Sequence, residues 1–382
     1  MPQVSPHAAS MPRSGIRRVM DAAWASGQPF IGMHVGEPNF IPPLHVLEAA
    51  ERAYAEGDTH YVPNAGIPAL REAIAVKVRE QNGLAVNASD VVVTAGGAQA
   101  LHVAFTLTLS EGDEVLIPDP GWPNFAMAVE LLQAVPVRYT LRPEDGFMPS
   151  IEDLERLVTE RTKMILVNTP SNPLGTVIPG ELVEKLVRFA DTHDLWLLSD
   201  ECYDALTYGA EHVSPGRFDE QGRVLSAFSF SKTFAMTGVR VGYLVCPPGV
   251  AETAAKLQEP MISCVNAPAQ AAAVAALTGP QDAVDEMRSA YARRRELAMR
   301  LLDERGIPYL EPHGAFYLWV DVRGITDLPV ADWALQLLAD KQVAVAPGTT
   351  FGPEGEGWIR LSLATSDEDI EQGIIRIGEM TR

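Results

Sequence analysis

The chain reads Ser229-Phe230-Ser231-Lys232-Thr233-Phe234 directly after the apolar residues 224–228. This stretch places one lysine between small hydroxyl residues, and Arg240 follows eight positions later (240 − 232). A primary amine can condense with an aldehyde, while hydroxyl groups and a guanidinium can hold a phosphate. The stretch therefore indicates a site for a phosphorylated aldehyde. Lys232 would bind its carbonyl carbon, and Ser229, Ser231 and Arg240 would hold its phosphate.

Composition limits the class of protein around this site. With 382 residues, the chain is longer than the size at which single hydrophobic cores stop growing, so we expect two domains. Hydrophobic residues make up 47% of the chain, enough to bury a sizeable core. The formal net charge is 30 − 50 = −20, and no lysine- or arginine-rich tract is present. This balance argues against a nucleic-acid-binding surface.

The cysteines and the hydrophobic runs exclude further classes. The three cysteines, Cys202, Cys246 and Cys264, are an odd set without CxxC spacing. This pattern argues against a disulfide framework and a zinc ribbon, and we expect no metal site. The first residues contain no apolar signal-peptide core, and no run of about 18 apolar residues occurs. We expect a soluble, cytoplasmic protein without membrane contact.

Strand-like and helix-like patterns alternate from about residue 45 to residue 285. β-Branched or apolar runs at 91–94, 114–118, 163–167 and 195–198 each lead into a loop rich in glycine, proline or polar residues. This alternation predicts an α/β fold with a mainly parallel sheet, which places ligands at the carboxyl ends of its strands. We expect an N-terminal arm with part of a small domain (1–45), a large α/β domain (46–285) and a small α+β domain (286–382).

Several loop residues are candidates for binding a ligand. Asp200 directly follows a buried strand, so its charge needs a cationic partner. Pro120 and Pro123 restrict the loop around Trp122, which leaves this ring either a fixed stacking surface or a place in the core. Glycines at the turn before Ala98 can turn backbone N–H groups toward a phosphate, although neither a P-loop nor a dinucleotide-binding fingerprint is present.

The pattern SxSKxxxxxGxRxGY over residues 229–243 closely resembles the lysine segment of fold type I aminotransferases that use pyridoxal phosphate (PLP). Further segments resemble this family in the same order, and the resemblance extends from Gly36 to Arg360. These segments are GEPxF at 36–40, YxPxxGxxxLR at 61–71, the glycine turn at 94–101, the aromatic loop at 120–125, PxNPxG at 170–175 and DExY at 200–203. The fold implied is a large domain with a mainly parallel central sheet plus a smaller α+β domain.

The resemblance implies a role for each matching residue. Lys232, Asp200 and Tyr203 would be catalytic. Lys232 would form the Schiff base, and Asp200 would pair with the protonated pyridine nitrogen of the cofactor. Tyr203 and Asn172 would both hydrogen-bond the phenolic oxygen of the cofactor. Trp122 would stack on the cofactor ring. The implied phosphate ligands are Gly97, Ala98, Gln99, Ser229, Ser231 and Arg240. Tyr61 would reach the phosphate across a homodimer interface. The substrate carboxylate would meet Gly36, Asn172 and Arg360.

The function implied is the transfer of an amino group between an L-amino acid and a 2-oxo acid by a ping-pong mechanism, as part of amino acid metabolism or biosynthesis. A C–S β-lyase or related synthase would keep the same cofactor residues, so this alternative stays open. A fused transcriptional regulator would need a DNA-binding module before the PLP domain, and residues 1–30 are too short for one. A non-catalytic relative would most simply lack Lys232 or Asp200, and both are present.

The sequence does not identify the substrate. Some aspartate-using relatives carry a lysine at the position of Ala98, and it contacts the side-chain carboxylate of aspartate. Its absence here weakens an aspartate assignment without excluding it. Candidates for the substrate pocket are His34, Trp122, Phe316 and Arg293.

Overall fold

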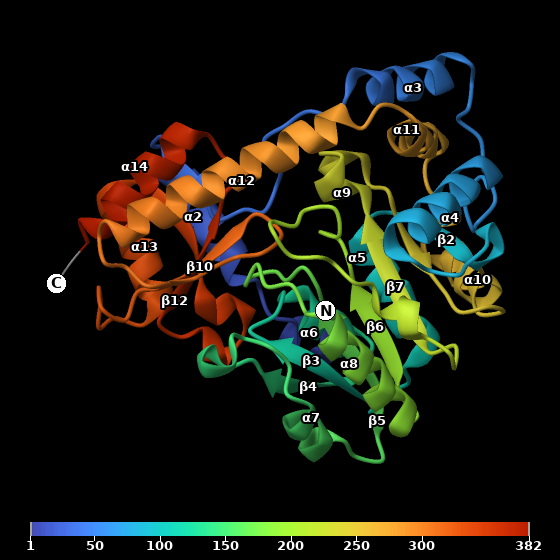
Figure 1. The fold of residues 1–382 in the computed structure, drawn as a ribbon, viewed down its shortest axis with the longest axis horizontal. Coiled ribbons are helices and arrows are strands. Elements are labelled where there is room, and N and C mark those ends of the chain that lie inside the picture. The colour runs from blue at the N-terminus through green and yellow to red at the C-terminus, as the bar shows by residue number, and fades with distance from the viewer. Residues whose placement is uncertain (1, 381–382) are drawn as a thin grey trace.

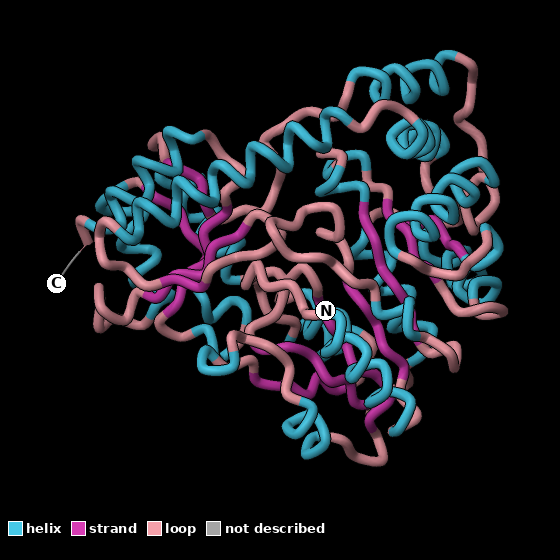
Figure 2. Tube along the Cα trace, in the orientation of Figure 1, coloured by secondary structure: helices cyan, strands magenta, loops and turns pink. Residues whose placement is uncertain are grey.

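The structure is a computed structural model that describes residues 2–380, so residue 1 and residues 381–382 at the ends of the predicted domains lie outside it. Within this range the strands form two sheets, of seven and five strands. Figure 2 shows both groups of strands surrounded by helices, with the five-stranded sheet at the left of the view.

The seven-stranded sheet has the order β2-β8-β7-β6-β5-β3-β4. Its strands are β2 (Val91–Thr94), β3 (Glu114–Asp119), β4 (Val135–Thr140), β5 (Thr162–Asn168), β6 (Trp196–Asp200), β7 (Val224–Ser229) and β8 (Gly242–Val245). Only β8 runs antiparallel to its neighbours β2 and β7. Most residues of the inner strands β5, β6 and β7 are buried, as expected for parallel strands with helices on both faces.

The carboxyl ends of the parallel strands meet at one edge of this sheet. The neighbours β5, β6 and β7 end at Asn168, Asp200 and Ser229, and the registers pair Asn168 with Asp200 and Asp200 with Ala227. Loops leaving this edge therefore start within one or two strand spacings of one another. The sheet brings together the DExY, PxNPxG and lysine segments, which lie far apart in the sequence.

The five-stranded sheet has the order β1-β11-β12-β10-β9 and joins both ends of the chain. Its strands are β1 (Ile31–Met33), β9 (Tyr309–Leu310), β10 (Tyr317–Asp321), β11 (Val343–Pro347) and β12 (Trp358–Ser362). Strand β1 pairs in parallel with β11, so the segment that follows β1 lies beside the sheet built by the C-terminal part of the chain. The indole rings of Trp319 and Trp358 stack with centroids 5.9 Å apart.

Helices cover both sheets and connect them. The α-helices are α1 (Pro6–Ser10), α2 (Gly15–Ser26), α3 (Leu44–Ala55), α4 (Pro68–Asn82), α5 (Gly97–Thr108), α6 (Asn124–Leu131), α7 (Ile151–Leu157), α8 (Gly180–Thr192), α9 (Phe230–Thr233), α10 (Ala251–Ile262), α11 (Ala267–Thr278), α12 (Asp282–Asp303), α13 (Val330–Lys341) and α14 (Asp367–Gly378). The 3-10 helices are η1 (Ala88–Asp90), η2 (Pro143–Asp145), η3 (Pro215–Phe218), η4 (Thr237–Val239), η5 (Gly348–Phe351) and η6 (Pro353–Gly355).

Helix α12 is a long helix that connects the regions of the two sheets, as the helical pattern through residues 281–296 of the sequence predicts. It spans 22 residues and buries Met287, Tyr291, Ala298 and Leu302, which recur at spacings of four and seven residues along one face. In Figure 1 it runs from the side of the five-stranded sheet to the neighbourhood of α3 and α11. One helix thus connects the two parts of the protein that enclose the cavity described below.

Several elements are not predicted from the sequence. Within the predicted N-terminal arm, helix α1 begins at Pro6, where Ser5 accepts a hydrogen bond from the Ala8 N–H at 3.2 Å. Proline at the first helical position and serine before it are a capping pattern that could have predicted this helix. Strands β4, β8, β9 and β11 are also not predicted. The domain boundaries at residues 45 and 285 stay predictions.

Candidate active site

A cavity of about 280 Å³ opens at the carboxyl edge of the seven-stranded sheet. It also touches β10, β12 and the segment after β1, so both sheets contribute to its walls. Its lining consists of Ile16, Val35, Gly36, Gly97, Ala98, Trp122, Asn172, Asp200, Cys202, Tyr203, Ser229, Ser231, Lys232, Arg240, Tyr317 and Arg360.

Lys232 lies in the short helix α9, at the end of β7. Ser229 caps this helix by accepting a hydrogen bond from the Ser231 N–H at 3.1 Å. The Lys232 Nζ atom donates to the carbonyl oxygen of Gly36 at 2.6 Å, across the two parts of the protein. Burial lowers the pKa of Lys232 to about 8, because water no longer solvates its charge. About a tenth of this amine is therefore neutral at pH 7, far more than for an ordinary lysine.

Asp200 ends strand β6 and is only 4% exposed. Its neighbours in sequence have polar partners: Glu201 is hydrogen-bonded to His212 at 2.8 Å, and Asp204 forms an ion pair with Lys77. Asp200 forms none within residues 2–380, although the Cys202 N–H donates to its Oδ1 at 3.2 Å. Burial raises its pKa to about 6. A cationic group in the cavity would offset the free-energy cost of burying the charge and keep the Asp200 carboxylate ionised.

Arg360 presents the opposite charge on strand β12 and is 2% exposed. Its Nη1 donates to Asn172 Oδ1 at 2.9 Å, and its Nη2 donates to the His34 carbonyl at 2.5 Å. The guanidinium lies over the ring of Tyr317, 4.3 Å from the centroid. In the described part of the chain it meets no carboxylate, and burial lowers its pKa. A buried guanidinium without an anionic partner is suited to a ligand carboxylate.

Arg240 and two glycines form the other end of the cavity. Arg240 has a left-handed backbone (φ 60°), and its guanidinium donates to the carbonyl oxygens of Thr237 at 2.9 Å and Ala95 at 3.1 Å. Gly96 lies so close that a Cβ there would be 2.4 Å from Arg240 Nη2. Helix α5 begins at Gly97, so unpaired N–H groups of its first turn lie beside this guanidinium. Together they make an anion-binding end.

Two tyrosines and a glycine fix the wall between the sheets. The hydroxyl groups of Tyr203 and Tyr317 are 2.7 Å apart. A Cβ on Gly36 would lie 1.8 Å from the Tyr317 hydroxyl oxygen, so only glycine fits at this position. Burial raises the pKa of Tyr203 well above its ordinary value, which keeps its hydroxyl protonated.

The profile of the family described as "Aminotransferase class I and II" matches residues 28–377. The chain belongs to this aminotransferase family. The probable aspartate/prephenate aminotransferase of Aquifex aeolicus is 41% identical over 361 residues, covering 92% of this chain and 91% of the relative. The aspartate/prephenate aminotransferase of Thermus thermophilus is 41% identical over 357 residues, covering 93% and 91%. A solved structure of Thermus thermophilus aspartate aminotransferase, a single mutant, has a TM-score of 0.95 at 39% identity, covering 100% of both chains.

These similarities confirm the predicted fold type I architecture and identify this aminotransferase as a PLP-dependent enzyme. The cavity fits this cofactor in chemistry. It combines a buried amine at Lys232, a buried carboxylate without an ion pair at Asp200 and an anion-binding end at Arg240. Trp122 adds a flat ring to the lining, and it meets Phe125 edge-on at 5.6 Å.

Two predicted cofactor residues of the aminotransferase do not line the cavity. Gln99 accepts a hydrogen bond from the Ala95 N–H at 2.5 Å through its side chain, so it stabilises the glycine turn. Tyr61 is 88% exposed on the loop between α3 and α4. Its predicted contact with the cofactor of a second subunit stays a prediction. The other residues predicted for cofactor and substrate all line the cavity.

Among the candidates for the substrate pocket, only Trp122 lines the cavity. His34 is buried, and its carbonyl oxygen, not its ring, meets Arg360. Phe316 belongs to the core beneath the five-stranded sheet, and Arg293 lies on a separate surface depression beside α12.

Four lining residues are not predicted from the sequence: Ile16, Val35, Cys202 and Tyr317. Val35 and Tyr317 each follow a predicted pocket candidate, His34 and Phe316. Successive side chains of an extended segment point to opposite sides, so only one of two neighbouring residues faces the cavity. The period-2 pattern alone could not decide this choice, because residues on both faces of β10 are buried.

Proposed function

We propose that this aminotransferase moves an amino group between an L-amino acid and a 2-oxo acid by a ping-pong mechanism, with PLP held on Lys232 through a Schiff base. One observation carries the proposal: the buried carboxylate of Asp200 and the buried guanidinium of Arg360 line the same cavity as the Lys232 amine, and neither has an ion-pair partner within residues 2–380. A cofactor with a protonated ring nitrogen supplies the partner for Asp200. A substrate α-carboxylate supplies the partner for Arg360.

PLP, when bound, withdraws electrons from the Cα atom of the amino acid and so makes its proton removable. The protein residues orient the reactants and move this proton. Arg360 would bind the α-carboxylate in a two-point contact, because its Nε makes no hydrogen bond within the described residues and is free to donate beside one Nη atom. Because Asn172 Oδ1 accepts from Arg360, the Asn172 amide nitrogen is left to donate, and it would bind the phenolic oxygen of the cofactor.

Lys232 is suited to receive the Cα proton. Its pKa of about 8 makes the freed amine neutral often enough to accept a proton near neutral pH, and its ammonium form can return that proton. Its bond to the Gly36 carbonyl places the amine between the two sheets, on the side where Arg360 would hold the substrate. Tyr203 stays protonated and can donate a hydrogen bond to the cofactor from the Tyr317 side.

Covalent trapping tests the role of Lys232. Borohydride reduction of the PLP-loaded enzyme should fix the cofactor to one peptide, which mass spectrometry identifies as the peptide that carries Lys232. Lys232→Ala should abolish trapping and turnover, while Lys185→Ala, at an exposed position of α8, should change neither. Trapping on another lysine, or trapping in Lys232→Ala, would remove the proposed assignment.

The proposal includes a homodimer, as the Tyr61 segment suggests. Ile41, Leu44, Leu47, Tyr54 and Tyr61 are large apolar side chains exposed on or near α3. Figure 1 shows α3 at the periphery of the molecule, packed against α11. Exposed apolar groups gathered on one face mark an interaction surface. A second copy of the chain would cover them and bring its Tyr61 to the cofactor phosphate.

Subunit complementation tests this sharing. Lys232→Ala and Tyr61→Ala proteins, each inactive or weakly active alone, are mixed under conditions that exchange subunits. If Tyr61 acts across the interface, the hybrid has one site with both residues intact, and activity returns. If Tyr61 acts in its own subunit, each site of the hybrid carries one defect, and activity does not return.

A C–S β-lyase on the same scaffold is the alternative function, because it would use the same cofactor residues. The products separate the two. An aminotransferase converts an amino acid to the matching 2-oxo acid without releasing ammonia, whereas the lyase releases ammonia and pyruvate. The relatives named aspartate/prephenate aminotransferases favour amino transfer. A role in amino acid biosynthesis is part of the proposal and comes from the sequence resemblance.

Within the described residues no helix is long and apolar enough to span a membrane. The cytoplasmic location stays a proposal from the sequence.

A further inference from the structure

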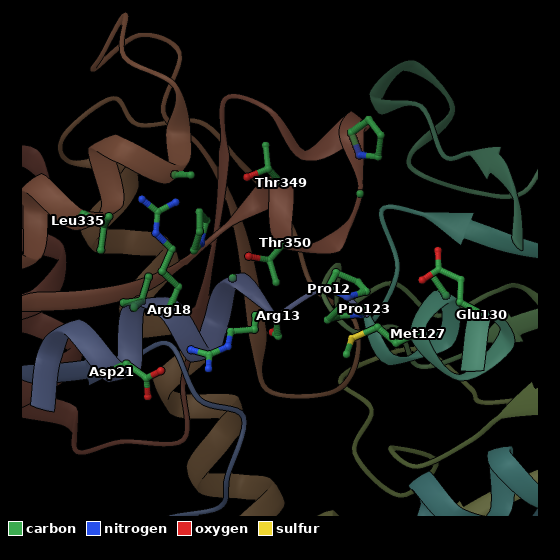
Figure 3. A pocket seen from close by; sticks show the side chains of 18 of the residues that line it. Pro12, Arg13, Arg18, Asp21, Pro123, Met127, Glu130, Leu335, Thr349 and Thr350 are labelled. Atoms are coloured by element: carbon green, nitrogen blue, oxygen red, sulfur yellow. The ribbon is translucent and has the colours of Figure 1, made fainter. Parts of the chain in front are cut away.

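A second and larger cavity, of about 660 Å³, lies beside the active site (Figure 3). The N-terminal segment and α2 form one wall, α6 forms another, and α13 with the loop from Pro347 to Pro353 closes it. Its lining consists of Pro12, Arg13, Ser14, Gly15, Arg18, Val19, Asp21, Pro123, Ala126, Met127, Glu130, Arg138, Ala331, Leu335, Pro347, Thr349, Thr350, Gly352 and Pro353. We call it the outer cavity.

The outer cavity is separate from the active-site cavity, because the two share no lining residue. Chain neighbours line the two sides: Gly15 and Pro123 face the outer cavity, whereas Ile16 and Trp122 face the active site. A single layer of chain therefore divides them. None of the residues assigned to cofactor or substrate reaches the outer cavity, so the proposed reaction leaves its lining unexplained.

Three arginines line the outer cavity. Arg13 and Arg18 take part in no ion pair or side-chain hydrogen bond within the described residues, and Arg138 reaches Asp119 only at 3.8 Å. Two acidic residues, Asp21 and Glu130, share the lining, and Asp119 lies beside Arg138, so three carboxylates balance the three arginines. Because Arg13 and Arg18 have no ion-pair partner within the described residues, their guanidinium groups stay available to an anionic ligand.

Hydrogen-bond donors lie on both sides of the outer cavity. Ser14 is the N-cap of α2 but makes no side-chain bond to the first turn, so the N–H groups of this turn are not capped by it. The Thr350 Oγ1 atom is buried without a partner and lies under Gly15, where a Cβ would be 2.2 Å away. Figure 3 shows Arg18 between Leu335 and the two threonines, with Glu130 on the far side of them.

The rest of the lining is apolar. Val19, Ala126, Met127 and Leu335 line it, together with prolines from three segments. A volume of this size lies within the range of small-molecule sites, which combine apolar walls with a few polar groups that orient the ligand. The lining therefore suits a molecule with an apolar body and one anionic group.

We propose that the outer cavity is a second ligand site, which binds a small organic anion between Arg13, Arg18 and the first turn of α2. The anionic group is a carboxylate or a phosphate, since a guanidinium binds both in the same two-point geometry. The apolar body lies against Met127 and Ala126 of α6, on the side of the arginines away from Leu335 (Figure 3). The site does not depend on the catalytic function, because no catalytic residue contributes to it.

Calorimetric titration of the full-length, PLP-loaded protein tests the site. The probes are benzoate and phenyl phosphate, and benzyl alcohol is the neutral control of similar shape. We expect both anions to bind and benzyl alcohol to bind at least about tenfold more weakly, since each charged hydrogen bond contributes about 1.5–3 kcal/mol. Preference for one anion would identify which of the two groups the site selects.

Variants separate the outer cavity from the active site. Arg13→Gln with Arg18→Gln should weaken anion binding at least about tenfold. Arg17→Gln is the matched control, because Arg17 is exposed on the same helix and does not line the cavity. Arg360→Gln removes the carboxylate site of the active site and should leave this binding intact. An unchanged cofactor spectrum shows that each variant is folded.

The proposal is wrong if anion binding disappears in Arg360→Gln and persists in the double variant, because the probe then occupies the active site. It is also wrong if benzyl alcohol binds as well as benzoate, or if neither anion binds at roughly 1 mM. Turnover enters none of these readouts, so a failure of the proposed amino transfer would be seen separately, as absence of products from a protein that still binds anions.

Discussion

Replacing Arg360 by glutamine should separate substrate binding from folding. Arg360 is buried and donates to Asn172 and to the His34 carbonyl, but it has no carboxylate partner among the described residues. A substrate α-carboxylate would complete a buried, hydrogen-bonded charge pair. Truncating one member of such a pair costs about 2–5 kcal/mol. We therefore expect kcat/KM to fall by about 30-fold to about 4,000-fold, at 1.4 kcal/mol per factor of ten.

The same substitution should shift the pH dependence. Arg360 is one of the charges that lower the pKa of Lys232, after the larger effect of burial. Without this charge the Lys232 ammonium is less disfavoured, so its pKa rises above about 8. The alkaline rise of activity should move to higher pH in Arg360→Gln. A variant that had only lost packing would not move it.

The assay compares two substrates for wild type, Arg360→Gln and the matched control Arg293→Gln, which lies at an exposed position outside the cavity. One substrate is a reactive amino acid, and the other is the corresponding amine without the α-carboxylate. Arg360→Gln should lose activity toward the amino acid only. An equal loss for both substrates, or a loss below about threefold, roughly 0.7 kcal/mol, would refute the role of Arg360.

Further predictions concern pH and packing. Formation of the Lys232–PLP bond in cofactor-free enzyme should accelerate about tenfold from pH 7 to pH 9 and then level off, because the neutral amine reacts and its pKa is about 8. Stopped-flow absorbance measures this rate. A rate that still rises steeply above pH 9, as for an ordinary lysine, would contradict the prediction. Burial, followed by the charge of Arg360, lowers the pKa of His34 from 6.5 to about 4, so the unfolded chain binds more protons at this group between these values. Buried carboxylates such as Asp200, whose pKa is raised to about 6, act in the opposite direction but are common to wild type and His34→Gln. The free energy of unfolding of wild type relative to His34→Gln should therefore fall by about 3 kcal/mol as pH drops from 6.5 to 4, and equal pH dependence of the two proteins in chemical denaturation would contradict this. Gly36→Ala should destabilise the protein by about 1–3 kcal/mol and reduce activity, because a Cβ would lie 1.8 Å from the Tyr317 hydroxyl and displace that hydroxyl from Tyr203. The control Gly324→Ala, whose Cβ would meet no atom within 4 Å, should do neither. Equal melting temperatures for the two variants would show that the wall between the sheets is not rigid.

The sequence predicts the large sheet well because its strands are continuous apolar runs that end in polar or glycine-rich loops. The runs before Asn168, Asp200 and Ser229 are buried on both faces, so hydrophobicity alone marks them. The strand pattern also predicts at which edge of the sheet ligands bind, because parallel strands end on one side. Strand β4 could not be predicted from hydrophobicity. It lies at the edge of the sheet, and its partly exposed sequence carries Pro136 and Arg138 instead of an apolar run.

The cofactor end of the site is predicted more completely than the substrate end. Lys232, Asp200 and Asn172 lie in short motifs directly at strand ends, where local sequence determines position. The substrate end depends on contacts between distant segments. Tyr317 lines the cavity because it meets Tyr203 and Gly36, and Ile16 does so because the N-terminal segment packs against the loop after β11. No local pattern encodes such contacts, so the structure was needed to find them.

Amino transfer itself is the central claim, and isotope transfer tests it most directly. The PLP-loaded enzyme is mixed with an amino acid that carries a heavy nitrogen isotope and with an unlabelled 2-oxo acid, and the nitrogen-containing products are followed by mass spectrometry. The account predicts that the label appears in the amino acid formed from the 2-oxo acid and that no labelled ammonia accumulates. Label in ammonia, with pyruvate as the other product and no labelled amino acid, would contradict amino transfer and establish the lyase.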